Sequence, residues 1–257
     1  KNLTIKQGTT YYRFPCEVAS YEMTCSIKAQ MFDGNGNPGK EYTYTVRDYA
    51  EYLINHPDLY PDAIPFAKAM LNYGACSQLY FNVAVDNLAN SNLSVDEQRV
   101  LDPDTYMDLH QFKTSYNKNE VLGKFAGISL VLKSETTLNI FYEPEDGVDI
   151  GKLSFMVDGK SVKPEKRESY YVLSLSNIKA NALDKFKTFV VTDGTNILTG
   201  DYCAMMYCYQ VLNASSGTYE DDLVMLIKAF CVVSLKRSTT PLTRIRLPKQ
   251  NIPSNGA

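Results

Sequence analysis

The chain resembles itself at a fixed distance, and this limits the folds open to it more than any other feature. When the sequence is shifted by 160 positions, the turn pair Asp33-Gly34 falls on Asp193-Gly194 without a gap. The predicted elements around these turns follow in the same order in both copies. We therefore expect two copies of one structural unit, an organisation that is common in binding and scaffolding proteins. The shift also superposes Tyr11 and Tyr171, Tyr42 and Tyr202, Tyr49 and Tyr209, Asp62 and Asp222, Lys68 and Lys228, and Ala69 and Ala229.

The first copy is predicted to consist of strands followed by two helices. Alternating side chains predict one strand over Ile27–Phe32 and another over 41–45, and the residues between them are turn-forming Gly and Asn. Thr45 and Asp48 match a capping box, which marks the start of a helix. The two predicted helices of this copy cover 46–55 and 62–79.

The second copy has more strands ahead of the same pattern. A last helix, over 219–235, is predicted to be capped by Thr218. The strands ahead of the aligned region run from 128 to 168 here, but cover only about ten residues in the first copy. Either the first copy has lost its front strands or the given chain begins inside the unit, and we favour the second explanation. The predicted strands cover 128–132, 136–142, 153–157, 170–175 and 186–192.

These elements place the chain in the α+β class. We predict two related units, each an antiparallel β-sheet or sandwich with a helical hairpin packed against it. The first unit covers 1–85, and a partly ordered connector at 86–127 leads to the second unit at 128–236. Residues 237–257 have no core pattern and are predicted to form an extended or disordered tail.

Composition argues against several classes of protein. Hydrophobic residues make up 44% of the chain, which is enough for a core and argues against global disorder. The net charge is −3 and the Lys and Arg residues are dispersed, which argues against a nucleic-acid binder. No apolar run approaches the ~20 residues that span a bilayer. Tyrosine is abundant at 19 residues and tryptophan is absent, which favours strand surfaces and adaptable polar contacts over a sugar-binding face of Trp side chains.

The six cysteines do not have the spacing of a metal site. None forms a CxxC pair, and no His lies at zinc-finger spacing, so we predict neither a metal nor a cofactor. We expect small, buried, apolar side chains, and one or two disulfides in an oxidising compartment remain the alternative. The cysteines are Cys16, Cys25, Cys76, Cys203, Cys208 and Cys231.

A weak calcium candidate lies in the first turn. Asp33, Asn35 and Asn37 match the first oxygen-ligand positions of a calcium loop. The sixth position is Pro38 instead of Gly, and the twelfth is Tyr44 instead of Glu. We therefore interpret the segment as a β-turn, with calcium as the alternative.

Two further groups could carry acid–base chemistry. His56 and His110 are the only histidines, and neither neighbourhood resembles that of a catalytic nucleophile. An acidic cluster could supply a carboxyl pair for glycoside hydrolysis or bind a cation. A solvated hairpin loop is the interpretation that we favour for this cluster, which consists of Glu143, Glu145, Asp146 and Asp149.

The repeated lysines and tyrosines have structural interpretations. Lys68 and Lys228 are expected to cover apolar surface with their aliphatic stems. The tyrosines are expected to pack the junction of sheet and helix in each unit, and a tyrosine-rich ligand face is the alternative. The tyrosine pairs are Tyr42 with Tyr202 and Tyr49 with Tyr209.

Two segments of the first unit resemble a known kind of module. The sequence YTYTVRDYAEYLINHPD at 42–58 is followed by AKAMLNYGACSQLY at 67–80 and by DNLAN at 86–90. Together they resemble a repeat in large, mostly uncharacterised secreted and cell-surface proteins of gut and rumen Firmicutes, and 202–236 resembles a degenerate second copy. The resemblance implies an extracellular or cell-surface location and carries no known catalytic residue.

These observations favour a non-enzymatic module with an adhesion, ligand-binding or spacer role. The partner would be a host or dietary glycan or a surface protein. The alternative is an accessory region of a hydrolase that acts on polysaccharide.

Overall fold

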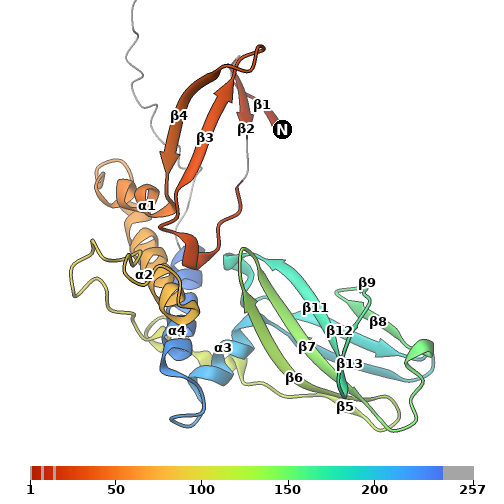
Figure 1. The fold of residues 1–257 in the computed structure, drawn as a ribbon. Coiled ribbons are helices and arrows are strands. Elements are labelled where there is room, and N and C mark those ends of the chain that lie inside the picture. The colour runs from red at the N-terminus through yellow and green to blue at the C-terminus, as the bar shows by residue number, and fades with distance from the viewer. Residues whose placement is uncertain (1, 7–8, 14–15, 240–257) are drawn as a thin grey trace, which may run out of the picture.

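The computed structural model describes residues 2–6, 9–13 and 16–239, and it confirms the α+β class. Figure 1 shows a β-sandwich, a group of helices beside one end of it, and strands near the N-terminus that extend away from the helices. In the described part of the chain, no helix is both long enough and apolar enough to cross a membrane.

The sandwich consists of two antiparallel sheets whose inner faces cover each other. Its core contains fully buried side chains from both sheets, such as Ile140 from the first and Phe189 and Val191 from the second. The first sheet has the order β10 (Glu165–Arg167), β11 (Tyr170–Ile178), β7 (Thr136–Pro144), β6 (Gly123–Leu132), β5 (Lys118–Asn119). The second has the order β13 (Ile197–Tyr202), β12 (Lys187–Thr192), β8 (Ser154–Val157), β9 (Lys160–Ser161).

The predicted turn between β8 and β9 is confirmed. Asp158 and Gly159 have φ angles of 53° and 75°, the left-handed conformation that a two-residue hairpin loop requires. Because Asp and Gly tolerate this conformation better than other residues, the local sequence determines where the hairpin turns.

Within the described residues, four α-helices form two hairpins that pack on each other. The Tyr73 and Phe230 rings lie 5.6 Å apart where α2 contacts α4. Short 3-10 helices precede or connect these elements: η1 (Ser20–Glu22), η2 (Pro61–Ala63), η3 (Pro103–Thr105), η4 (Leu109–Phe112), η5 (Ile150–Lys152) and η6 (Ala180–Ala182). The α-helices are α1 (Val46–Ile54), α2 (Ile64–Phe81), α3 (Ala204–Leu212) and α4 (Asp221–Thr239).

The sequence pattern predicts the start of α1 correctly but not that of α4. The capping box is confirmed, because the Asp48 amide donates to Thr45 Oγ1 at 2.9 Å and the Thr45 amide donates to Asp48 Oδ2 at 2.8 Å. In contrast, α4 begins at Asp221, two residues after the predicted start at 219, so the prediction that Thr218 caps it is wrong. Its first turn contains the carboxylates of Asp221 and Asp222, which favour the helix dipole. It extends to Thr239, past the predicted start of the tail at 237, and residues 240–257 lie outside the described part of the chain.

The repeat is visible in the order of elements. A 3-10 helix, a strand, an Asx turn, a strand and two α-helices follow one another from η1 to α2 and again from η6 to α4. The strands of the first copy are β1 (Asn2–Lys6) and β2 (Thr9–Arg13), which pair with each other, and β3 (Ile27–Phe32) and β4 (Pro38–Tyr44), which do the same.

The constant shift of 160 is wrong beyond the turn. Ala29 pairs with Tyr42 as Phe189 pairs with Gly200, so the shift is 160 in the first strand but 158 in the second. The first turn is one residue longer, and a bulge next to it adds another. Tyr202 is therefore equivalent to Tyr44 instead of Tyr42. The same shift of 158 relates Tyr49 to Tyr207 instead of Tyr209, and it relates the helix ends Asn55 and Asn213.

The offset between equivalent residues of the two copies changes once more in the helices α2 and α4. Ser77 on α2 shares a hydrogen bond of 2.6 Å with Ser20 on η1. Ser234 on α4 donates to the Ala180 carbonyl on η6 at 2.5 Å. These two serines are 157 positions apart, so the repeated Lys68 and Lys228 do not hold equivalent positions.

The predicted connector contains ordered structure. It includes η3, η4 and β5, and its predicted end at 127 falls inside β6. Leu109 and Phe112 of η4 are buried in the core of the sandwich unit. The first sheet of the sandwich therefore begins earlier in the chain, at β5, than the pattern of residues 128–132 indicated.

Candidate functional site

The β3–β4 hairpin presents an apolar face to solvent. The equivalent face of the β12–β13 hairpin, in the second copy, is buried. In β12, Phe189 and Val191 point into the sandwich and are fully buried. At the equivalent positions of β3, Ala29 is exposed and Met31 keeps 71% of its surface accessible. The alternation that marks a buried face is thus present, although the face itself lies open to solvent.

Aromatic side chains complete this face from β4. Tyr42 stands directly opposite Ala29, and Tyr44 stands opposite Ile27, so these four share one side of the hairpin with Met31. Both tyrosines are half-buried, and Lys40 Nζ lies 5.1 Å from the centre of the Tyr42 ring. We call these residues the hairpin face: Ile27, Ala29, Met31, Tyr42 and Tyr44.

The opposite side of the hairpin is mainly polar. Lys28 forms an ion pair of 3.1 Å with Glu41, and Gln30 Nε2 donates to the Gly39 carbonyl at 2.9 Å. Phe32 is the apolar exception on this side and is 62% exposed. The hairpin therefore has one apolar side and one mainly polar side. Exposure to water does not explain this difference, because both sides are exposed.

In the segment predicted as a weak calcium site, the carboxylate oxygens of Asp33 accept hydrogen bonds from within the turn. Asp33 Oδ1 accepts from the amides of Asn35 and Asn37 at 2.8 and 2.9 Å, and Asp33 Oδ2 accepts from Asn37 Nδ2 at 2.9 Å. These bonds, chiefly those from Asn37, lower the pKa of the Asp33 carboxyl. Both carboxylate oxygens thus hold the turn together, as those of Asp193 do in the second copy.

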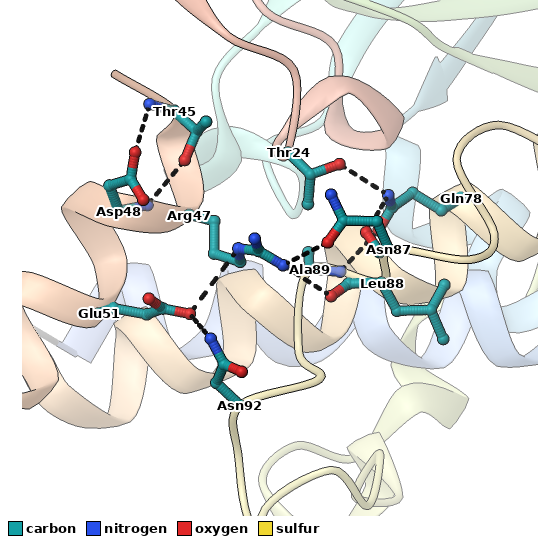
Figure 2. A network of polar contacts seen from close by, with 10 residues as sticks. All are labelled: Thr24, Thr45, Arg47, Asp48, Glu51, Gln78, Asn87, Leu88, Ala89 and Asn92. Carbon is teal, nitrogen blue, oxygen red and sulfur yellow. Dashed lines mark hydrogen bonds and ion pairs between the residues drawn. The ribbon is translucent and has the colours of Figure 1, made fainter. Parts of the chain in front are cut away.

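The base of the hairpin is fixed by a polar network around Gln78 (Figure 2). The Gln78 side chain is fully buried, and its Nε2 donates to Thr24 Oγ1 at 3.1 Å, three residues before β3. Its Oε1 accepts from the Ala89 amide at 2.7 Å, and its Nε2 also reaches the carbonyls of Ala84 and Asn87. One amide side chain thus connects α2, the loop after it and the segment that leads into β3.

Arg47 and Glu51 extend this network along α1. Arg47 Nη1 donates to Asn87 Oδ1 at 2.8 Å, and Glu51 accepts from Asn92 Nδ2 at 2.8 Å. The Arg47 amide donates to the Met23 carbonyl at 2.9 Å. We call the side chains of Arg47, Glu51 and Gln78, with the loop that they hold, the clasp.

Close packing explains the glycine of the second motif. A Cβ atom on Gly74 would lie 2.6 Å from Met23 Sδ and 2.9 Å from Ala89 Cβ. Only glycine therefore lets α2 approach both the segment before β3 and the loop after α2. The motifs at 42–58 and 67–80 therefore have a structural role here, which is to position the hairpin.

The histidines have structural contacts. His56 Nδ1 lies 2.8 Å from the Tyr52 carbonyl, and its ring stacks on Tyr52 at 4.0 Å. His110 Nδ1 lies 3.3 Å from the hydroxyl of Tyr209. The histidines thus stabilise a helix end and the contact of η4 with α3.

Both glutamates of the acidic cluster form ion pairs with lysines at the sandwich surface. Lys124 pairs with Glu143 at 3.2 Å, and Lys118 reaches Glu145 at 3.6 Å. Asp149 accepts from the Gly151 amide at 3.0 Å as the cap of η5. Within residues 2–6, 9–13 and 16–239, no three His, Cys, Asp or Glu side chains are placed to hold a metal ion.

Both repeated lysines attach the connector to the helices. Lys68 Nζ donates to Glu97 at 2.5 Å, and this bond is the main reason that the pKa of Glu97 falls to about 2. Lys228 Nζ lies 3.9 Å from Asp102. The sequence analysis predicted a packing role for the aliphatic stems of these lysines. In the structure their charged ends also form ion pairs with the connector.

Beside Lys68 is a shallow hollow of about 230 Å³ between α2 and α4. Its floor contains Ala69 and Val232, and its rim is charged. At the rim, Lys236 Nζ stands 4.2 Å from the centre of the Tyr106 ring. Lys68 and Lys236 thus both contact the connector at this hollow, through Glu97 and Tyr106.

Of the tyrosines Tyr42, Tyr49, Tyr202 and Tyr209, only Tyr202 is completely buried. Burial raises its pKa to about 12, and its ring lies among Phe125 and Phe189. Its equivalent Tyr44 lies on the open hairpin face. The same residue type thus fills the core in one copy and faces solvent in the other.

The cysteines are all free thiols. Cys76, Cys203, Cys208 and Cys231 are buried, as expected for small apolar side chains, whereas Cys16 and Cys25 are exposed. Burial raises the pKa of both Cys76 and Cys203 to about 11. Such thiols are poor nucleophiles at neutral pH.

The sequence pattern did not single out the hairpin face as a site. A signal was present, because Ile27, Ala29 and Met31 alternate with polar residues while few strands precede them in their copy. Comparisons of the chain with protein-family models, with curated proteins and with solved structures found no match.

Proposed function

We propose that this chain is a non-enzymatic, protein-binding module of a bacterial cell-surface or secreted protein, and that the hairpin face is its binding surface. The observation that carries this proposal is the 71% exposure of Met31 on a face whose second copy is fully buried. An exposed apolar face with a polar reverse side is typical of an interaction surface.

A protein partner suits this face better than a glycan. Met31, Ala29 and Ile27 offer flexible apolar contact, and Tyr42 and Tyr44 add amphipathic rings, a combination that is common at protein interfaces. Sugar-binding surfaces rely on aromatic stacking with polar groups that converge on one point, and the polar groups of this hairpin lie mainly on its other side.

The surface location rests on sequence resemblance. The segments at 42–58 and 67–80 resemble repeats of secreted and cell-surface proteins of Firmicutes. In the structure these residues form the clasp that fixes the base of the hairpin. A module whose distinctive residues position the base of this hairpin is suited to presenting the hairpin to a partner.

A binding panel tests this proposal. Labelled chain is applied to immobilised mucin, fibronectin, collagen and fibrinogen, and in parallel to a glycan array. We expect binding to at least one protein, and we expect Met31→Lys to weaken it at least tenfold, because a charge replaces a buried apolar contact.

Leu59→Lys is the matched control for this test. Leu59 is 63% exposed in the loop between α1 and α2, so a charge there leaves the hairpin face unchanged. Binding to glycans alone, equal binding by the Met31→Lys chain, or turnover of a polysaccharide would contradict the proposal.

A further inference from the structure

The second copy shows how a hairpin of this kind is completed. β8 lies antiparallel against the outer edge of β12, with Val157 opposite Phe189 and Phe155 opposite Val191. The Thr188 carbonyl accepts from the Asp158 amide at 2.8 Å across this edge. The added strand places Phe155 and Val157, both buried, on the inner side of the sheet.

The outer edge of β3 is the equivalent place in the first copy. A shift of 160 takes Thr188 to Lys28, Phe189 to Ala29 and Val191 to Met31. Among the strands that the structure describes, β3 pairs only with β4, so none of them is hydrogen-bonded to this outer edge. Because the amide and carbonyl of one residue in an antiparallel strand point to the same side, Lys28 and Gln30 present theirs on the open edge.

We infer that β3 binds its partner by strand addition, and that the partner is an extended peptide segment that pairs antiparallel with Lys28–Phe32 as β8 pairs with β12. This inference rests on the proposed function and names the chemistry of its partner. Alternate residues of the partner are apolar and cover the hairpin face, and the residues between them are polar.

Two features of the edge favour this mode of binding. An open edge is a template of unpaired amides and carbonyls, and main-chain hydrogen bonds supply affinity in strand addition while side-chain pockets supply specificity. Charges on edge strands often prevent such pairing, but Lys28, the charge on β3, is neutralised across the hairpin by Glu41 at 3.1 Å.

The size of the residues adds a requirement on the partner. Ala29 stands where Phe189 stands in the second copy, and Met31 stands where Val191 stands. A strand beside Ala29 therefore meets more room than β8 does beside Phe189. We expect partners with a large apolar residue at the position opposite Ala29.

A peptide taken from the chain itself is the probe. The segment of residues 152–159, KLSFMVDG, contains β8 and is added to the full-length, isotopically labelled chain. Amide hydrogen exchange is then followed by NMR. We expect the Lys28 and Gln30 amides to exchange at least tenfold more slowly at saturating peptide, while the amides of β12 are unchanged.

Two controls define the register. The same peptide with Phe155→Lys has a charge where an apolar side chain would face Met31, and we expect at least tenfold weaker binding. The Met31→Lys chain should lose affinity for the native peptide to a similar extent, and the Leu59→Lys chain should retain it.

The possible failures are distinguishable. Unchanged exchange at Lys28 and Gln30 overturns strand addition, and so does equal binding of the Phe155→Lys peptide. Protection of the same amides without peptide, in a chain that sediments as a dimer, assigns the edge to a second copy and also overturns the inference. If the peptide gives no protection while Met31→Lys abolishes binding on the protein panel, strand addition fails and the proposed function stands.

Discussion

The hairpins β3–β4 and β12–β13 share their turn chemistry and differ in their surroundings. Asp33 and Asp193 each accept two backbone amides and one Asn side chain. The first hairpin stands alone among the described strands, whereas the second is one edge of a four-stranded sheet that covers another sheet. Local sequence is thus sufficient to form the turn, and the strands available elsewhere decide whether the hairpin is buried.

The two hairpins are also held in place by different kinds of interaction. Apolar packing dominates in the second, where Phe189, Tyr202 and Leu198 are almost completely buried. In the first, the base of the hairpin depends on hydrogen bonds from one buried amide, Gln78. This contrast can be tested by substitutions at matched positions.

The largest difference is expected for side chains on the two inner faces. Phe189→Ala should lower the free energy of unfolding by about 3–5 kcal/mol, because it leaves a cavity in the sandwich. Met31→Ala, on the equivalent but open face, should change it by less than about 0.5 kcal/mol. Urea denaturation of both variants measures the contrast. Comparable losses would mean that the hairpin face is covered in solution.

A smaller loss is expected when the clasp is broken. Gln78→Ala should cost roughly 3 kcal/mol, because the Ala89 amide and several carbonyls lose a buried partner. Gln111→Ala is the control, since Gln111 is exposed and donates one bond to the Asp108 carbonyl. Urea denaturation gives the stability, and exchange of the Ala89 amide reports on the loop. An unchanged Ala89 amide would show that Gln78 does not hold it.

The smallest expected effect is a difference between the two turns at low pH. Hydrogen bonds from Asn37 and Asn196 lower the pKa values of Asp33 and Asp193 below their ordinary value of 3.8. The carboxylates therefore stabilise the turns above pH 3.8, and this contribution is lost as the pH falls through the lowered pKa values.

Amide exchange at Asn37 and Asn196, followed by NMR between pH 6 and pH 2, compares the turns. We expect the first turn to open before the second, which β8 and β13 still hold in the sheet. Asp33→Asn should remove the pH dependence of the protection factor at the Asn37 amide. The protection factor at Asn196 should keep its pH dependence. Opening of both turns at one pH would show that the sheet contributes nothing to the second.

Features that depend on neighbouring residues could be predicted from the sequence. The capping box of Thr45 and Asp48, the strand Ile27–Phe32 and the turn at Asp158-Gly159 all follow from contacts within a few positions, and the structure confirms them. The interpretation of Asp33 as a turn residue belongs with them, since its partners Asn35 and Asn37 are two and four positions away.

Features that depend on contacts between residues far apart in the chain could not be predicted from the sequence. A bulge beside a longer turn changed the equivalence of the tyrosines, because bulges depend on pairing across the hairpin. The roles of Gln78, Lys68 and His110 arise from partners far along the chain. For the same reason the alternation of Ile27, Ala29 and Met31 could not show which of the two copies has a covered face.

The clasp has a consequence for the thermodynamics of binding. A two-stranded hairpin alone is marginally stable in water, so a partner that binds it ordinarily has to order it first. Here Thr24, three residues before β3, is held by Gln78, and Thr45, immediately after β4, caps α1. Both ends of the hairpin are therefore preorganised. A partner then loses conformational entropy mainly in its own chain and at the tip of the hairpin, which leaves more of the interaction energy for affinity.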